Sequence, residues 1–201
     1  MGTDHRSISD NTHSGNAVEP DVRAARESDA PSIAGLHVRS FQSAYAGLIP
    51  ENHLRSLDAS ARESIWSDRI VGARDLARHI LVTGVAERLV GFIYYGPSPD
   101  ADDDPTEVGH VFSVHVDPGL TGGGIGSNLL AHAVKIMAQT GFVEATLWVV
   151  ETNPAARRFY ERLGWRPDGA RQREHLGLED EPGPDFDVET VRYRLRIGVP
   201  W

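Results

Sequence analysis

Four glycines stand within five residues of this sequence, in the run Gly122-Gly123-Gly124-Ile125-Gly126. The run follows a β-branched and aromatic stretch at 108–116 that is typical of a strand, and a helical spacing of apolar residues begins after it at Ser127. The first N–H groups of a helix lack partners within the helix and carry the positive end of its dipole. Because glycine leaves those amides uncovered, the run predicts a binding site for a phosphate or pyrophosphate. One glycine would suit a tight turn with positive φ, but four in five residues favour anion binding.

Two common nucleotide-binding loops are excluded by their spacing. A P-loop needs Lys followed by Ser or Thr after its second glycine, and Gly126 is followed here by Ser127 and Asn128. A dinucleotide-binding loop that starts at Gly122 would need glycine at 127, and one that starts at Gly124 would need a small residue where Leu129 stands.

The run instead resembles the acetyl-CoA loop of the GNAT acyltransferase superfamily. That loop reads Arg or Gln, two residues, Gly, one residue, and then Gly or Ala, behind a strand that ends in Val-x-Pro. Gly124 and Gly126 occupy the two small positions, and Val116-Asp117-Pro118 supplies the end of the strand. Thr121 stands where the family prefers Arg or Gln. The resemblance implies that the loop binds the pyrophosphate of acetyl-CoA with one expected side-chain contact missing.

A second motif follows at the separation that the family shows. After a strand-like run at 143–150 come Asn153, Phe159-Tyr160 and Leu163-Gly164-Trp165, as in the family pattern of Asn, a helix start with small residues, Phe-Tyr and Leu-Gly-aromatic. By resemblance, Asn153 contacts the pantetheine or carbonyl region of the cofactor. Tyr160 is implied as the general acid beside the thioester sulfur, and the competing interpretation is a core tyrosine beside Phe159.

The resemblance also implies an architecture. The expected fold is α+β, with a mixed, mostly antiparallel central sheet flanked by helices and with splayed middle strands. The pantetheine is expected to pair with the backbone near Val114 and Val116, and the N–H of Val114 is the candidate oxyanion donor. The residues expected around acetyl-CoA, as co-substrate, are Val114, His115, Val116, Thr121, Gly122, Gly123, Gly124, Ile125, Gly126, Ser127, Asn153 and Ala156. No metal is expected.

Two residues on or beside the strand at 108–116 are candidates for the general base. Strict alternation predicts one face with His110, Phe112, Val114 and Val116, and the other with Gly109, Val111, Ser113 and His115. His110 lies where several family members carry a catalytic carboxylate, and the usual histidine pKa of about 6.5 suits a base near neutral pH. The alternative, weighed equally, is that His110 is a buried, hydrogen-bonded histidine of the core. Glu107 is the other candidate base, through a water molecule or together with His110.

The elements before this strand are expected to form the acceptor side. A helix is predicted from Ser28 or Asp29 to the break at Gly47, a short one after Pro50, and a third capped by Asp58 or Ser60. In the third helix, the residues predicted to face the core are Ile65, Trp66, Ile70 and Val71. In the GNAT superfamily the first helices border the acceptor site, so Phe41, Tyr45 and Trp66 are candidates for its wall. Packing in the core is the competing interpretation of each.

The remaining segments predict strands and loops. The runs 80–85 and 89–95 predict a hairpin, and 170–175 and 188–197 predict two further strands around a loop at 177–187. The loop 97–105 carries Asp100, Asp102, Asp103 and Asp104, and it is either solvated or draws a cationic amine towards the cleft.

Composition limits the function. The 201 residues predict one domain at 21–201 behind a flexible tail at 1–20. The net charge of −9 argues against a nucleic-acid partner, and the absence of cysteine excludes disulfides and thiol nucleophiles. The sequence has neither the roughly 20 apolar residues of a membrane span nor a signal core, so no membrane partner and a cytoplasmic location are expected.

The resulting hypothesis is an acetyl-CoA-dependent N-acetyltransferase that transfers the acetyl group directly to a primary amine. The acceptor is a small-molecule amine or a peptide N-terminus, and a homodimer is a further expectation from the family. A non-catalytic sensor that binds acyl-CoA is the alternative, since Thr121 departs from the pattern and the strand at 108–116 has no clear carboxylate base. A fold that binds NAD or ATP is the third hypothesis, and the loop spacings count against it.

Overall fold

The computed structural model describes residues 21–73, 77–85, 87–175 and 187–198. The predicted tail at 1–20 and nearly all of the predicted loop at 177–187 lie outside these ranges. Within them, no helix combines the length and the apolar character that a membrane span requires.

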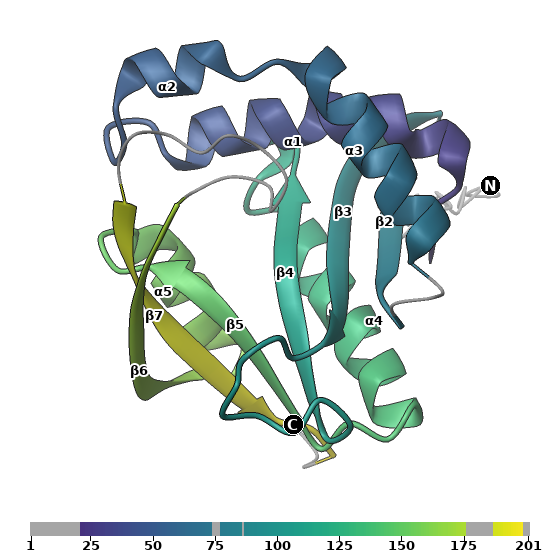
Figure 1. Ribbon diagram of the computed structural model, residues 1–201. Helices are drawn as coiled ribbons and strands as arrows, with labels where there is room; N and C mark the ends of the chain where they lie inside the picture. Colours follow the sequence, from purple (N-terminus) through teal and green to yellow (C-terminus); the bar gives the residue numbers. More distant parts are fainter. Residues whose placement is uncertain (1–20, 74–76, 86, 176–186, 199–201) are drawn as a thin grey trace, which may run out of the picture.

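Seven strands form one sheet, in the order β1-β2-β3-β4-β5-β7-β6 (Figure 1). Every neighbouring pair is antiparallel except β4 and β5, which are parallel. The sheet is therefore mixed and mostly antiparallel, as predicted. Its strands are β1 (Val22–Ala24), β2 (His79–Val85), β3 (Arg88–Pro97), β4 (Val108–Val116), β5 (Glu144–Val150), β6 (Arg166–His175) and β7 (Asp187–Arg196).

Helices cover both faces of the sheet (Figure 1). One face carries α1 (Ala30–Ala44) and α3 (Ala59–Gly72), which are joined through α2 (Glu51–Ser56). The other face carries α4 (Ile125–Gln139) and α5 (Pro154–Arg162). Each face buries its own apolar cluster, with Ile33, Trp66 and Phe92 on the α1 side and Leu129, Met137 and Leu147 on the α4 side. Burial of these clusters is the main favourable term in folding.

Local sequence signals set several helix ends. Asp58 caps α3 as predicted, because its Oδ1 atom accepts a hydrogen bond from the N–H of Ser60 at 2.9 Å.

The prediction that Val71 points inward is wrong, since 63% of this residue is exposed. At 3.6 residues per turn, Val71 lies about 140° around α3 from the buried Trp66. The helix α4 begins at Ile125, earlier than the predicted start at Ser127.

The two middle strands separate after a short parallel contact. Residues Val108 to His110 of β4 pair with Glu144 to Thr146 of β5, and no further pair joins them. Beyond His110, β4 stays paired with β3, and β5 stays paired with β7 (Figure 1). The predicted splay of the middle strands is confirmed.

A bulge at Phe112 accompanies this separation. Tyr94 of β3 pairs with Ser113 and Tyr95 pairs with Val111, so Phe112 is an extra residue on β4. A bulge bends its strand and increases the local twist. The bend therefore begins next to the last β4–β5 pair and helps to carry β4 away from β5.

The bulge also reverses which face each later residue of β4 occupies. Val114 and Val116 pack against the apolar cluster on the α4 side, whereas Phe112 packs on the α1 side. The ring of His115 stacks on Phe92, also on the α1 side. The prediction of strict alternation along β4 is therefore wrong, because the extra residue shifts the two-residue period by one.

Candidate active site

The glycine run forms the turn before α4 as predicted. Gly122 and Gly124 both have φ of 85°, in the left-handed region, and Gly124 is the N-cap residue of α4. The first bond of the helix runs from the N–H of Asn128 to the carbonyl of Gly124 at 2.9 Å. Within the described residues, the N–H groups of 124–127 donate to no backbone carbonyl. Four amides at the positive end of a helix are thus available to an anion.

Close packing brings these amides to the end of the splayed strand. A Cβ atom on Gly126 would lie 3.3 Å from Cζ of Phe159 on α5 and 3.5 Å from Cγ2 of Val116 on β4. At Gly122 and Gly124, by contrast, a Cβ atom would meet nothing within 4 Å. The turn is therefore packed on one side and open on the other, which fits a loop that binds a diphosphate.

Thr121 does not replace the missing Arg or Gln. Its exposed side chain donates a hydrogen bond to the carbonyl of Pro118 at 2.6 Å, within its own turn. The loop is held further by Asp117, whose carboxylate accepts hydrogen bonds from the N–H of Gly119 and from the guanidinium of Arg88. The contacts of the loop with a diphosphate would thus come mainly from its backbone.

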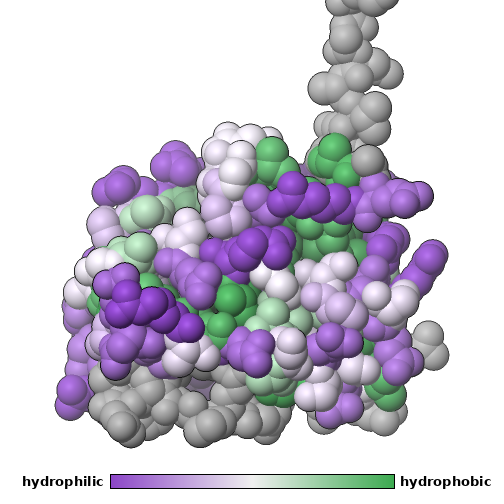
Figure 2. Space-filling model, turned by 90° about the horizontal axis from the view of Figure 1, so that it is seen from above, coloured by the Kyte–Doolittle hydropathy of each residue, from purple (hydrophilic) through white to green (hydrophobic). Residues whose placement is uncertain are grey.

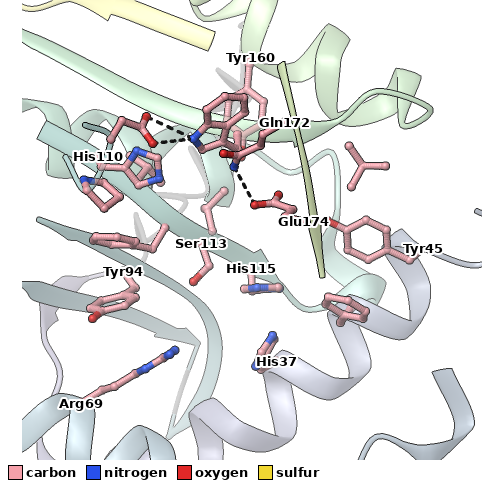
Figure 3. Close-up of a pocket in the computed structure, with 18 residues that line it drawn as sticks. His37, Tyr45, Arg69, Tyr94, His110, Ser113, His115, Tyr160, Gln172 and Glu174 are labelled. Atoms are coloured by element: carbon pink, nitrogen blue, oxygen red, sulfur yellow. Dashed lines mark hydrogen bonds between the residues drawn. The ribbon is translucent and has the colours of Figure 1, made fainter. Parts of the chain in front are cut away.

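A pocket of about 450 Å³ is lined by residues of α1, α3, α5 and four strands (Figure 3). Six of its lining side chains are aromatic, namely Phe41, Tyr45, Tyr94, Phe112, Trp148 and Tyr160. Val114 lines the same pocket, so the pocket reaches the separated part of β4. The pocket thus extends from Phe41 and Tyr45 of the predicted acceptor wall to Val114, the candidate oxyanion donor.

Tyr160 lies on α5, the helix after Asn153, as predicted, and it lines this pocket. Its half-buried ring packs against Phe159 and Trp165, with ring centroids 5.0 and 6.1 Å away. Burial raises the pKa of the Tyr160 phenol, so the phenol keeps its proton at neutral pH. It can therefore donate that proton to a leaving thiolate.

His110 is one of the residues that line the pocket, but it is almost fully buried. Only 4% of the residue is exposed, and its Nδ1 atom lies 2.9 Å from Oγ1 of Thr146 on β5. Burial lowers the pKa of the imidazole to about 4, so His110 is uncharged and a weak base at neutral pH. Its environment fits the core interpretation better than the role of base.

Glu107 lies outside the pocket. Its side chain is exposed just before β4, and its carbonyl accepts a hydrogen bond from the N–H of Val143 at 2.8 Å. That end of β4 is where the strand still pairs with β5, away from the splay. The structure therefore does not bring the two predicted bases together.

His115 contacts α1 rather than the cofactor side of the sheet. Its Nδ1 atom lies 2.7 Å from Oγ of Ser40, and its ring centroid is 4.6 Å from that of His37. Burial lowers the pKa of His115 to about 4 and that of His37 well below its usual value. Both histidines are therefore uncharged at neutral pH, and only the backbone of His115 remains for the predicted cofactor contact.

Asn153 caps α5 with the oxygen of its side chain. Its Oδ1 atom accepts a hydrogen bond from the N–H of Ala156 at 3.0 Å, and 6% of the residue is exposed. The cap fixes the start of the helix that carries Tyr160. The cap does not use the amide nitrogen of Asn153, which can donate a hydrogen bond to a cofactor.

Two of the three predicted wall residues line the pocket. Phe41 and Tyr45 have ring centroids 4.4 Å apart and both face the pocket. Burial raises the pKa of Tyr45 to about 12. Trp66 is fully buried beside Phe92 and does not line the pocket, which fits the alternative of core packing.

The acidic loop between β3 and β4 is bound to the sheet rather than merely solvated. Arg192 on β7 donates hydrogen bonds to Asp100 at 3.1 Å and to both oxygens of Asp102 at 2.7 Å. Asp103 pairs with Arg194 at 2.7 Å. The three carboxylates lie close enough together to hold a cation, but the two arginines already provide the compensating charge.

Two carboxylates of the pocket were not predicted as site residues. Asp100 accepts hydrogen bonds from Nε1 of Trp148, with both oxygens 3.2 Å away. Glu174 on β6 lines the pocket beside Gln172. Neither position is marked by a local motif, because both come to the pocket through pairing of strands that are distant in the sequence.

Seen from above, the helix-bearing end of the molecule shows hydrophobic areas broken up by hydrophilic side chains (Figure 2). The large hydrophobic residues that stand exposed in the described chain are Val71, Val85, Leu120 and Val143. These four residues come from separate elements of the fold. The homodimer expected from the family stays a prediction.

Comparison with known proteins gives consistent matches. Residues 41–165 match the model of the Acetyltransferase (GNAT) family. The chain is 28% identical over 180 residues to the uncharacterized N-acetyltransferase YuaI of Bacillus subtilis, which covers 90% of this chain and 91% of that protein. It is 38% identical over 79 residues to the mycothiol acetyltransferase of Kocuria rhizophila. That match covers 39% of this chain and only 26% of the relative.

Solved structures show the same fold. The PaiA N-acetyltransferase from Thermoplasma acidophilum, in complex with coenzyme A, superposes with a TM-score of 0.66 at 20% identity, covering 89% of this chain and 99% of that one. The protein yncA from Salmonella typhimurium, with its cofactor acetyl-CoA, gives a TM-score of 0.63 at 19% identity, covering 91% and 96%.

Proposed function

The chain belongs to the GNAT acetyltransferase family, and from this membership we propose that it transfers an acetyl group from acetyl-CoA directly to a primary amine. The observation that carries the proposal is the early separation of β4 from β5, which exposes one edge of β4 beside the pocket. Strand edges pair readily with extended ligands. An extended pantetheine arm is such a ligand.

The glycine turn fits the diphosphate of coenzyme A. The amides of 124–127 are available, and the open sides of Gly122 and Gly124 leave room where a side chain would otherwise stand. In this proposal the amides hold the diphosphate, and the N–H of Val114 stabilises the oxyanion of the tetrahedral intermediate. Tyr160 donates its proton to the departing sulfur.

Direct transfer, without a covalent enzyme intermediate, fits the composition. The sequence contains no cysteine, so no cysteine thioester of the enzyme can form. In this proposal the amine attacks the carbonyl of acetyl-CoA while both are bound, and the pocket walled by Phe41 and Tyr45 is the proposed place for it.

A sensor that binds acyl-CoA without catalysis is the second candidate. The observation in its favour is that Thr121 makes its hydrogen bond within the turn and offers no long side chain to the diphosphate. Release of free thiol from acetyl-CoA, measured with and without a panel of primary amines, separates the two. Amine-dependent release supports the enzyme, and binding of acetyl-CoA without release supports the sensor.

A further inference from the structure

Glu174 places a carboxylate inside the pocket. It lies on β6, is half-buried, and lines the pocket together with Tyr45 and Tyr160. Its Oε2 atom accepts a hydrogen bond from Nε2 of Gln172 at 2.9 Å. Figure 3 shows this carboxylate turned in among the lining side chains.

No cation of the described chain forms an ion pair with this carboxylate. The neighbouring Arg173 pairs with Glu189 at 2.9 Å. The guanidinium of Arg69 lies 5.3 Å from the ring centroid of Trp66, and Figure 3 places Arg69 well apart from Glu174. The segment 176–186 contains neither Lys nor Arg.

The other groups around the pocket do not supply the missing positive charge. His37, His110 and His115 are uncharged at neutral pH because burial lowers the pKa of each. Tyr45 and Tyr160 keep their protons, and Asp100 is itself paired with Arg192.

The carboxylate of Glu174 is therefore poorly compensated. Burial raises the pKa of the Glu174 carboxyl, and the nearby charge of Asp100 raises it further, against the hydrogen bonds from Gln172 and Thr190. Burying a carboxylate without a counter-charge costs folding free energy, and a bound cation offsets part of that cost.

We propose that Glu174 binds the ammonium group of the acceptor and then takes a proton from it. This inference rests on the proposed function, because it concerns the acceptor of the same reaction. It defines the acceptor class as amines that are protonated in solution, which enter the pocket as cations.

The proton steps balance as follows. The ammonium gives one proton to the Glu174 carboxylate, which leaves a neutral amine and a neutral carboxylic acid. The nitrogen lone pair attacks the thioester carbon, and the C–S bond breaks as the tetrahedral intermediate collapses. The sulfur takes the phenolic proton of Tyr160, and the second N–H proton restores the phenol. The proton on Glu174 leaves to solvent.

Glu174 suits this role better than the two bases predicted from the sequence. Glu107 is exposed outside the pocket, and His110 is enclosed beside Thr146 with its pKa lowered. A raised carboxyl pKa lies nearer to neutral pH, where a general base is most effective.

The first test is thermal melting of Glu174→Gln, with Glu189→Gln as the control on the paired strand. The folded pKa of Glu174 is raised above the unfolded value of about 4.3, so the wild type loses stability as pH rises through the folded pKa. Glu174→Gln is therefore expected to melt higher than the wild type at neutral pH and equally near about pH 4. Glu189→Gln is expected to melt as the wild type does, because Glu189 is exposed.

The second test compares ethylamine, which is protonated at neutral pH, with trifluoroethylamine, which is not. Glu174→Gln is expected to lower kcat/KM for ethylamine roughly 100-fold or more, and to lower it much less for trifluoroethylamine. For Glu174→Gln, the Kd of coenzyme A should equal that of the wild type. For Glu189→Gln, the kcat/KM values for the two amines should equal those of the wild type.

Three results would overturn the inference alone. They are a lower melting temperature of Glu174→Gln at neutral pH, an unchanged kcat/KM for ethylamine, and an equal loss for both amines. Binding of acetyl-CoA by the wild type without thiol release with any amine would overturn the proposed function as well.

Discussion

The Cβ position of Gly126 on α4 lies 3.3 Å from the Cζ atom of Phe159 on α5. Phe159 precedes the proposed general acid Tyr160, and Gly126 contributes one of the amides proposed to hold the diphosphate. The start of α4 is thus packed closely against α5, the helix that carries Tyr160. A glycine at 126 is needed for this close approach rather than for a special φ.

Gly126→Ala is expected to weaken the binding of coenzyme A about tenfold or more, which corresponds to about 1.4 kcal/mol. The added methyl group must move Phe159 or the start of α4, and overpacking of this kind also costs about 1–3 kcal/mol of stability. Calorimetric titration with coenzyme A measures the effect. Gly35→Ala on α1 is the control, because its Cβ would approach only the flexible guanidinium of Arg39. Wild-type affinity in Gly126→Ala would contradict the proposed place of the diphosphate.

Tyr160→Phe is expected to lower kcat roughly 100-fold, with the Kd of coenzyme A unchanged, because only the proton for the leaving sulfur is lost. Tyr95→Phe provides the control, because Tyr95 is a buried tyrosine that does not line the pocket. Its hydroxyl has no hydrogen-bond partner in the described chain. Steady-state kinetics of thiol release compares the two. Equal kcat values for Tyr160→Phe and the wild type would exclude the phenol as the acid.

Acid is expected to destabilise the protein through its buried histidines. The folded pKa of His115 is about 4, below the unfolded value of about 6.5. A lowered pKa means that the stabilisation is fully present above about pH 6.5 and is lost as pH falls towards about 4.

The melting temperature of the wild type should therefore fall as the pH is lowered over that range, and the melting temperature of His115→Asn should fall less steeply. His132→Asn, at an exposed position on α4, should follow the wild type. Differential scanning calorimetry across this range measures the slopes. Parallel curves for His115→Asn and the wild type would show that His115 does not titrate in this way.

Arg192 is expected to be a major contributor to stability. Its side chain is 6% exposed and binds Asp100, Asp102 and Asp168. Arg192→Ala should cost about 3–5 kcal/mol, because it removes a nearly buried guanidinium that compensates the charges of several carboxylates at once. Arg173→Ala breaks only an exposed pair and should cost less than about 1 kcal/mol.

Chemical denaturation of the two variants gives the comparison directly. Similar losses for Arg192→Ala and Arg173→Ala would show that the acidic loop is not held by Arg192. A large loss of stability in Arg192→Ala alone would show that Arg192 holds the loop that places Asp100 beside Trp148 in the pocket.

Local signals in the sequence predicted the parts of the site that depend on the backbone. The glycine turn before α4 and the Tyr160 helix after Asn153 are motifs of adjacent residues, and both are where the sequence placed them. The splay was expected only from the family resemblance. The bulge at Phe112 was missed because an inserted residue has no mark in a β-branched run, and it moved His115 to the face of His110.

Glu174 and Asp100 illustrate the other limit. Each reaches the pocket through the order of strands in the sheet, and neither sits in a recognisable motif. The arginines at 192 and 194 that bind the acidic loop are about ninety residues away in the sequence. Such partners are set by tertiary structure, which a single sequence read along its length does not reveal.

The time course of thiol release, when the wild-type protein is mixed with acetyl-CoA and a panel of primary amines, decides whether the protein transfers acetyl groups. We expect release that depends on the amine, with one acetylated amine detected by mass spectrometry for each thiol. Saturable binding of acetyl-CoA, with no release above the rate without amine, would contradict this expectation.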